Sequence, residues 1–152
     1  MPGRSLLDLG KTRVTKELCA CFAMRKAARS VTRFYTDHLN STEIGASQHS
    51  LLIIAYLSEG MTISRMADIA VMDRTTLTRN LKPLQRQQLI TIKPGEDRRQ
   101  KIVAITRKGI SLLKKIMPGW EKAQQKLERK LGSEKFDNLI TDLSEVVTKL
   151  KE

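Results

Sequence analysis

The segment from Met61 to Thr106 constrains the fold of this chain most strongly, because two helical patterns, a break and two strand-like runs follow one another directly. Apolar residues recur at the spacing of a short helix with one buried side, at Ile63, Met66, Ala67 and Ala70. After a three-residue break, Asp73 is a typical N-cap, so a second helix is predicted to begin at Arg74. This order predicts a helix-turn-helix unit.

The second predicted helix has a leucine face and a polar face. Leu77, Leu81 and Leu84 share one side, so the opposite side carries threonine hydroxyls and cations. Donors near the start of such a helix can reach base edges in a DNA major groove, and cations further along suit phosphates. The candidate contact residues are Arg74, Thr75, Thr76, Thr78, Arg79, Lys82 and Arg86. Pro83 is expected to kink this helix.

Two runs rich in Ile and Val, Leu89 to Lys93 and Lys101 to Ile105, predict the strands of a hairpin, or wing. The residues between them combine turn formers with charge. Arginines at such a tip, Arg98 and Arg99, can enter a DNA minor groove. Asp97 is expected to hold a neighbouring arginine in position.

At these motifs the sequence resembles the MarR family of bacterial winged-helix regulators, and the resemblance extends over nearly the whole chain. It rests on Asp73-Arg-Thr-Thr-Leu-Thr-Arg, on Asp97-Arg98-Arg99, and on Ile105-Thr106-Arg107-Lys108-Gly109, which has Ile105 where the family has leucine. The resemblance implies that Asp97 orients the wing and that Arg99 is the minor-groove arginine. Gly45 replaces the threonine that usually opens the preceding helix, whereas Gln48 matches the second half of its capping box.

Composition agrees with a polyanion partner but does not select one. The 28 Lys and Arg against 16 Asp and Glu give a net charge of +12, and the pI is about 10.1. This charge favours DNA, RNA and anionic membranes alike. A nonspecific nucleic-acid-binding protein therefore stays open as an alternative, although an RNA-binding sheet predicts stacking aromatic residues and the chain has only three Phe, one Trp and two Tyr.

No motif predicts an enzyme or a bound cofactor. The chain has no phosphate-binding glycine loop, no His-Glu-x-x-His motif, and two histidines that are not part of a nucleophile signature. We therefore expect no catalytic residues, no cofactor and no metal site. The longest apolar run, Leu51 to Leu57, is far below the ~20 residues that span a bilayer, and the N-terminus lacks a signal-peptide pattern, so a cytoplasmic protein without membrane contact is expected.

Both ends of the chain carry apolar stripes at helical spacing. Three long helices are predicted from Val14, Leu18, Cys21, Ala28, Val31, Tyr35 and Leu39, from Leu113, Ile116, Trp120, Ala123, Leu127 and Leu131, and from Phe136, Leu139, Ile140, Leu143, Val146, Val147 and Leu150. Gly132 and Ser133 separate the last two, and Pro118 is expected to bend the middle one. One winged unit can hardly bury three stripes, so a homodimer is favoured over a monomer with its stripes folded back.

The cysteines and a possible effector site leave alternatives open. Cys21 lies on the apolar stripe, which favours a small buried residue, whereas Cys19 falls on the polar side. The Cys21-Phe22 pair and Tyr35 also resemble the sensing site of the organic-hydroperoxide branch of the MarR family, so either thiol can be an oxidant sensor. Metal binding with His38 or His49 is a weaker alternative. The resemblance further implies a small-molecule pocket, for which Arg25, Tyr35 and His49 are candidate wall residues.

These observations predict a mainly α fold with a small β-hairpin wing. We expect a single MarR-like domain over residues 1–152, with a winged helix-turn-helix unit near 44–106 and N- and C-terminal dimerisation helices near 6–42 and 107–152. The expected function is a sequence-specific, ligand-responsive repressor that binds pseudo-palindromic double-stranded DNA as a homodimer. The operator, the effector and the direction of regulation are not encoded in recognisable motifs.

Overall fold

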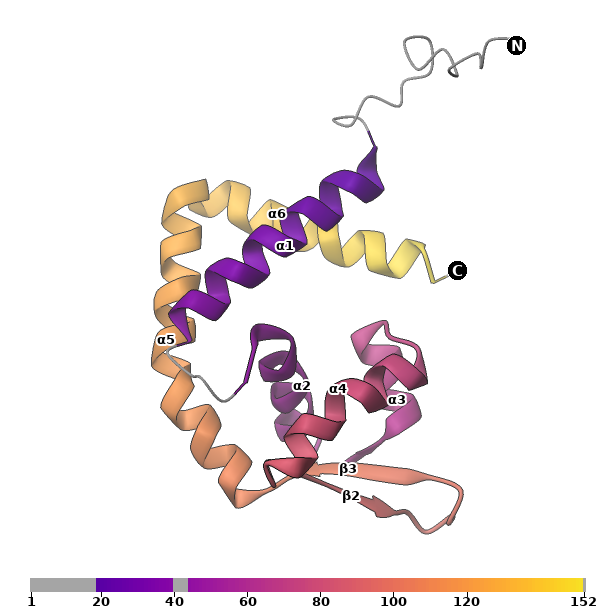
Figure 1. Ribbon diagram of the computed structural model, residues 1–152. Coiled ribbons are helices and arrows are strands. Elements are labelled where there is room, and N and C mark those ends of the chain that lie inside the picture. The colour runs from indigo at the N-terminus through magenta and orange to yellow at the C-terminus, as the bar shows by residue number, and fades with distance from the viewer. Residues whose placement is uncertain (1–18, 40–43, 152) are drawn as a thin grey trace, which may run out of the picture.

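The computed structural model describes residues 19–39 and 44–151, and within these ranges the chain forms six helices and three short strands (Figure 1). In order they are α1 Ala20–His38, α2 Ala46–Leu57, β1 Met61–Thr62, α3 Ile63–Ala70, α4 Arg74–Arg86, β2 Ile90–Pro94, β3 Lys101–Ile105, α5 Arg107–Leu131 and α6 Ser133–Lys149. The predicted fold class, mainly helical with a small sheet, is confirmed. Val14 and Leu18 of the first predicted stripe lie outside the described residues.

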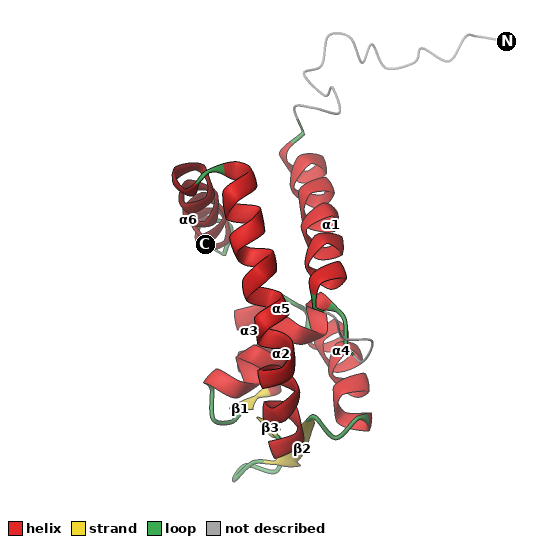
Figure 2. Ribbon diagram, turned by 90° about the vertical axis from the view of Figure 1, so that its left-hand side faces the viewer, coloured by secondary structure: helices red, strands yellow, loops and turns green. Residues whose placement is uncertain are grey.

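The elements form two groups, a winged unit and a set of long helices. Helices α2 to α4 and the strands form a winged unit, and α5 runs from the wing along one side of the molecule to the opposite end, where it is flanked by α1 and α6 (Figures 1 and 2). Gly132, with φ of 83°, separates α5 from α6 as predicted. Helix α5 continues through Pro118 without interruption.

The sheet has three antiparallel strands in the order β1-β3-β2. Val103 of β3 is fully buried between Met61 on one side and Ile92 on the other. The hairpin was predicted within one residue at β2, but β1 was missed. A strand of two residues leaves no alternating pattern in a sequence, and only its pairing with β3 defines it.

The core of the winged unit forms around α4. Leu77, Leu81 and Leu84 are fully buried, as the leucine face predicted, and they belong to one cluster with residues of α2, α3 and the sheet. Gly45 caps α2 without a side chain, and its N–H donates to Gln48 Oε1 at 3.2 Å. Only the Gln48 half of the capping box is therefore present.

A compact joint connects α4, β3 and α5. Helix α4 ends in a Schellman motif, with Gln88 at φ 58° and the N–H of Leu89 donating to the Leu84 carbonyl at 2.9 Å. The Thr106 N–H donates to the Leu89 carbonyl at 3.0 Å, and its hydroxyl donates to the Gln88 carbonyl at 2.7 Å. The same hydroxyl oxygen accepts from Gly109 N–H at 3.0 Å and so caps α5.

Considering only residues 19–39 and 44–151, helices α1 and α6 leave apolar side chains uncovered. Helix α1 has no buried residue, and Phe136 is the one buried residue of α6. The exposed large apolar residues on these helices and at the end of α6 are Phe22, Met24, Val31, Leu139, Ile140, Leu143, Val147 and Leu150. Among the described residues, no helix is both long enough and apolar enough to cross a bilayer.

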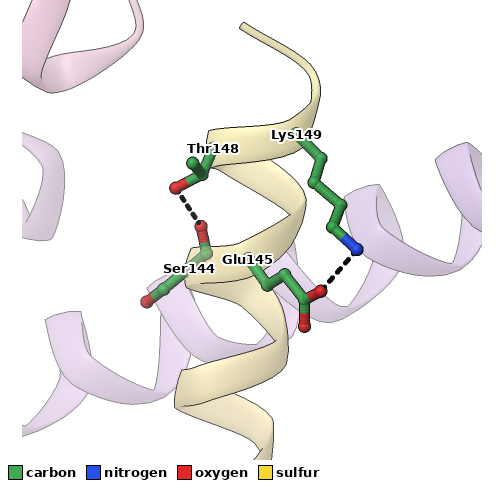
Figure 3. Close-up of polar contacts among 4 residues, drawn as sticks. All are labelled: Ser144, Glu145, Thr148 and Lys149. Atoms are coloured by element: carbon green, nitrogen blue, oxygen red, sulfur yellow. Dashed lines mark hydrogen bonds and ion pairs between the residues drawn. The ribbon is translucent and has the colours of Figure 1, made fainter. Parts of the chain in front are cut away.

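The final turns of α6 are held by polar contacts within the helix (Figure 3). The Thr148 hydroxyl donates to the Ser144 carbonyl at 3.1 Å, and Lys149 Nζ lies 2.6 Å from Glu145 Oε1. A glutamate four residues before a lysine is the favourable order along a helix. Beyond α6, Lys151 Nζ donates to the Asp68 carbonyl at 2.9 Å, so the end of the chain contacts α3 of the winged unit.

Replacing Gly109 with alanine is expected to lower the free energy of unfolding by roughly 1–3 kcal/mol, because a Cβ there would lie 2.2 Å from the Leu89 carbonyl oxygen and force overpacking. Helix propensity alone predicts the opposite sign. Gly45→Ser is the matched control, since a Cβ at Gly45 has no neighbour within 4 Å and a serine N-cap should stabilise by a few tenths of a kcal/mol. Urea unfolding of both variants measures the difference, and a stabilised Gly109→Ala protein would contradict this account of the joint.

Candidate nucleic-acid interface

Helix α4 is positioned by its N-cap. Asp73 Oδ1 accepts from the Thr76 N–H at 2.8 Å, as the sequence predicted. Hydrogen bonds from the side chain and the backbone of Thr76 hold the pKa of the Asp73 carboxyl below its usual value. The carboxylate is therefore ionised at neutral pH and complements the positive end of the α4 dipole. The first turn of α4 is thus held in place at the surface.

The side of α4 opposite the leucines faces solvent. Thr75, Arg79, Lys82 and Arg86 are exposed, and Thr76 and Thr78 on the flanks are half-buried. An open groove of about 420 Å³ on this side is lined by Arg74, Thr75, Thr78, Arg79 and Lys82. The structure therefore brings together five of the seven residues predicted for this helix, while Thr76 and Arg86 lie outside the groove.

The threonines on this side differ in what they can offer. Thr78 donates its hydroxyl to the Arg74 carbonyl at 2.7 Å, so its oxygen is left as an acceptor only. The Thr76 hydroxyl is half-buried and already bonds to the Asp73 carboxylate. Thr75, which is exposed near the helix start, is therefore the best placed of the three hydroxyls to donate to a ligand.

The turn between α3 and α4 is strained. Val71 has φ 52° and ψ 46°, in the left-handed region, which a β-branched residue adopts at a cost of about 1–3 kcal/mol. The N–H of the next residue, Met72, donates to the Ala67 carbonyl at 3.0 Å and closes the end of α3. The packing of both helices maintains this turn and sets their relative direction.

Asp97 organises the wing tip through the backbone. Its Oδ1 accepts from the Arg99 N–H at 2.9 Å, its carbonyl accepts from the Gln100 N–H at 2.8 Å, and the Gly95 N–H donates to the Gln100 carbonyl at 2.9 Å. The sequence predicted that Asp97 holds an arginine, and the contact found is to the main chain of Arg99. The side chains of Arg98 and Arg99 are exposed.

A second region, between the terminal helices and α2, holds a cavity of about 400 Å³. Tyr35 of α1 and His49 of α2 both line it, as do Trp120 and Gln124 of α5 and apolar residues of α6. The Tyr35 hydroxyl donates to Gln124 Oε1. Arg25, the third predicted wall residue, is absent from this cavity and lies beside Cys21 in another hollow between α1 and α6. Gln124 was missed because its partner Tyr35 is 89 positions away in the chain.

His49 is the buried polar residue of this cavity. It is 3% exposed, and its Nε2 has no hydrogen-bond partner within the described part of the chain. Burial lowers the pKa of the imidazole, so the ring is neutral at pH 7. A neutral ring nitrogen without a partner can donate to or accept from a ligand that enters the cavity.

The cysteines differ from the expectation. Cys21, predicted as a small buried residue, is exposed, whereas Cys19 is half-buried and forms the N-cap of α1 with an extended backbone. Among the described residues, α2 and α5 pack against the Tyr35 end of the α1 stripe, whereas the end that carries Cys21 borders an open hollow beside α6. Within residues 19–39 and 44–151, no group of three or more His, Cys, Asp or Glu side chains is arranged to hold a metal ion.

Comparison with known proteins places this architecture among transcriptional regulators. The sequence model of the MarR family matches residues 44–101. The organic hydroperoxide resistance transcriptional regulator of Bacillus subtilis is 31% identical over 98 residues, which cover 64% of this chain and 67% of that protein. The regulator Hpr of Bacillus cytotoxicus is 33% identical over 90 residues, and the matched part spans about half, 49%, of its length.

A solved structure extends the match over most of the chain. The crystal structure of the M. tuberculosis transcriptional regulator MosR in complex with DNA has a TM-score of 0.79 and 31% sequence identity. The alignment covers 88% of this chain and 96% of that one. The terminal helices, as well as the winged unit, therefore follow the arrangement of that regulator.

Proposed function

This chain belongs to the MarR family, and we propose that it is a sequence-specific repressor that binds pseudo-palindromic double-stranded DNA as a homodimer and responds to a small molecule. The observation that carries the proposal is the groove on α4, where Arg74, Thr75, Arg79 and Lys82 present donors on the exposed side of a capped helix. The similarity to MosR, which was solved with DNA, supports the same partner here.

The roles of the contact residues follow from their positions. Thr75 and Arg79 lie in the first half of α4 and suit base edges in the major groove, whereas Lys82 and Arg86 suit phosphates. Arg98 and Arg99 on the wing suit the adjacent minor groove, whose negative potential attracts guanidinium groups. Base reading and backbone binding are therefore assigned to different elements.

The homodimer rests on the uncovered apolar surface of the terminal helices. Phe22, Met24 and Val31 of α1 and Val147 of α6 are each about two-fifths exposed, and Leu150 beyond α6 is 81% exposed. Packing a second copy against α1 and α6 removes this surface from water. Two-fold symmetry then sets two α4 helices against the two halves of a palindromic site.

The proposed effector site is the cavity lined by Tyr35 and His49. Its walls are mostly apolar and aromatic, with the neutral His49 and the Tyr35–Gln124 pair as its central polar groups. This lining suits an aromatic compound with a small number of polar groups, such as a phenolic carboxylate. Because its walls come from α1, α2, α5 and α6, a ligand there contacts both the terminal helices and the winged unit.

Replacing Arg79 with alanine is expected to relax base preference, because each lost base contact removes roughly 1–3 kcal/mol of discrimination. Replacing Arg99 should instead weaken binding to all duplexes and lower the salt dependence of affinity. Arg129→Ala, at the far end of α5, is the charge-matched control and should change neither quantity. Binding to a selected site and to its scrambled form, measured over a salt series, tests this. An unchanged cognate-to-scrambled ratio in Arg79→Ala would refute the assignment of α4.

Replacing Val147 with aspartate should shift the protein from dimer to monomer, because a charge on the uncovered face of α6 opposes burial. Leu57→Asp is the control, since Leu57 is 74% exposed at the end of α2 in the winged unit and should not affect association. Light scattering coupled to size-exclusion chromatography measures both. A wild-type monomer, or a Val147→Asp dimer of unchanged stability, is inconsistent with the proposed interface.

Phenolic carboxylates should raise the melting temperature and lower DNA affinity of the wild type but not of His49→Phe, which keeps a ring and loses the polar atoms. Arg25→Ala is the control and should respond like the wild type, because Arg25 lies outside the cavity. Absence of any response to the phenolic compounds would remove support for the effector site.

The exposure of Cys21 supports the oxidant-sensing alternative. The same DNA-binding assay with an organic hydroperoxide favours that alternative if DNA is released by the wild type and retained by Cys21→Ser.

A further inference from the structure

A smaller cavity, of about 210 Å³, lies between the wing and the start of α3. It is lined by Thr62, Ile63, Ser64, Arg74, Arg99, Gln100 and Lys101. Three of these residues are cations and none is a carboxylate. The volume is several times the ~30 Å³ that one water molecule takes up in the liquid, so a phosphate group can enter.

Separate backbone constraints bring these residues together. Pairing of β1 with β3 places Thr62 opposite Ile102 and therefore next to Lys101. Asp97 orders Arg99 and Gln100 at the end of the wing turn. Asp73, the cap of α4, sets the position of Arg74. The cavity thus depends on β1, the strand that the sequence did not predict.

Charge and hydrogen-bonding capacity both favour an anion. Arg74, Arg99 and Lys101 repel one another unless a negative group lies between them. The Thr62 hydroxyl already accepts from the Arg65 N–H at 3.1 Å, so its hydrogen can be donated outward. The exposed Ser64 hydroxyl is a further donor at the positive end of α3.

The location of the cavity identifies the source of the anion. Arg74 lines this cavity and also the groove on α4, so the two adjoin at this residue. A duplex whose bases face that groove must carry its sugar-phosphate backbone along the edge of the groove. This position favours a DNA phosphate over a free phosphorylated metabolite.

We infer that this cavity binds one backbone phosphate of the DNA, clamped jointly by the wing and the helix-turn-helix. Ser64 and Lys101 then become DNA contacts in addition to the residues predicted from sequence. Arg99, which lines the cavity, then contacts this phosphate from the wing side in place of the minor groove, which is left to Arg98. The inference rests on the proposed DNA-binding function. Its consequence is that one phosphate couples the placement of the wing to that of α4.

The test is Lys101→Gln, with Lys93→Gln as its control on the neighbouring strand outside the cavity. Loss of one phosphate contact should lower affinity roughly tenfold for cognate and scrambled duplexes alike, with an unchanged ratio between them. The slope of log affinity against log salt should become shallower by about 0.9, whereas Lys93→Gln keeps the wild-type slope.

Ser64→Ala, which leaves the charge of the protein unchanged, should weaken binding to both duplexes with the salt slope unchanged. All three sites are exposed, and unchanged melting temperatures confirm intact folding.

Double variants test the shared phosphate. Lys101→Gln combined with Arg99→Ala should cost less than the sum of the two, because both remove support from one group, whereas Lys101→Gln with Arg86→Ala should be additive. A wild-type salt slope in Lys101→Gln overturns the clamp. If the wild type also fails to bind any duplex, the proposed function itself fails, so the two failures are distinguishable.

A titration with inorganic phosphate in the absence of DNA separates the two sources of the anion. Weak binding, at millimolar concentrations or above, together with the altered DNA slope supports the backbone phosphate. Tight binding that Lys101→Gln abolishes, together with an unchanged DNA slope, assigns the cavity to a free phosphate compound and overturns the inference.

Discussion

The carbonyl of Leu89 is the point on which the arrangement of this protein depends. It accepts the Thr106 N–H, and the backbone of Gly109 packs directly against it. Because Leu89 follows α4 and Thr106 caps α5, this contact fixes the end of α4, the end of the wing and the start of α5 relative to one another. The Ile105-Thr-x-x-Gly109 motif therefore has a structural explanation, with a cap supplied by the threonine and close approach permitted by the glycine.

From this joint the chain divides its surfaces by chemistry. In the winged unit, α4 buries Leu77, Leu81 and Leu84 and exposes cations and hydroxyls, whereas α1 and α6 expose apolar side chains. A charged surface suits a polyanion, and an uncovered apolar surface suits a second copy of the chain. The cavity around Tyr35 and His49 lies where the two kinds of surface meet, so its occupancy can affect their relative placement.

Local patterns in the sequence predicted local structure correctly. The cap predicted at Asp73 accepts the N–H of Thr76, three residues later. Sequence patterns did not predict which side chains of α1 are buried, because burial depends on which element covers the helix. Cys21 lies on an apolar stripe and was expected to be buried, yet it is exposed at the edge of an open hollow between α1 and α6. Arg25 and Tyr35 are on one helix, but Arg25 lies outside the cavity that Tyr35 shares with His49.

The amino-acid sequence by itself determined the helices, the hairpin, the outward face of α4 and the family, because periodicity, caps and turn residues act over a few positions. Only the tertiary structure decided which distant groups meet. The pairing of β1 with β3, the Tyr35–Gln124 hydrogen bond and the approach of Lys101 to Arg74 all join residues far apart in the chain. Such contacts arise from the packing of whole elements, and no local propensity specifies them.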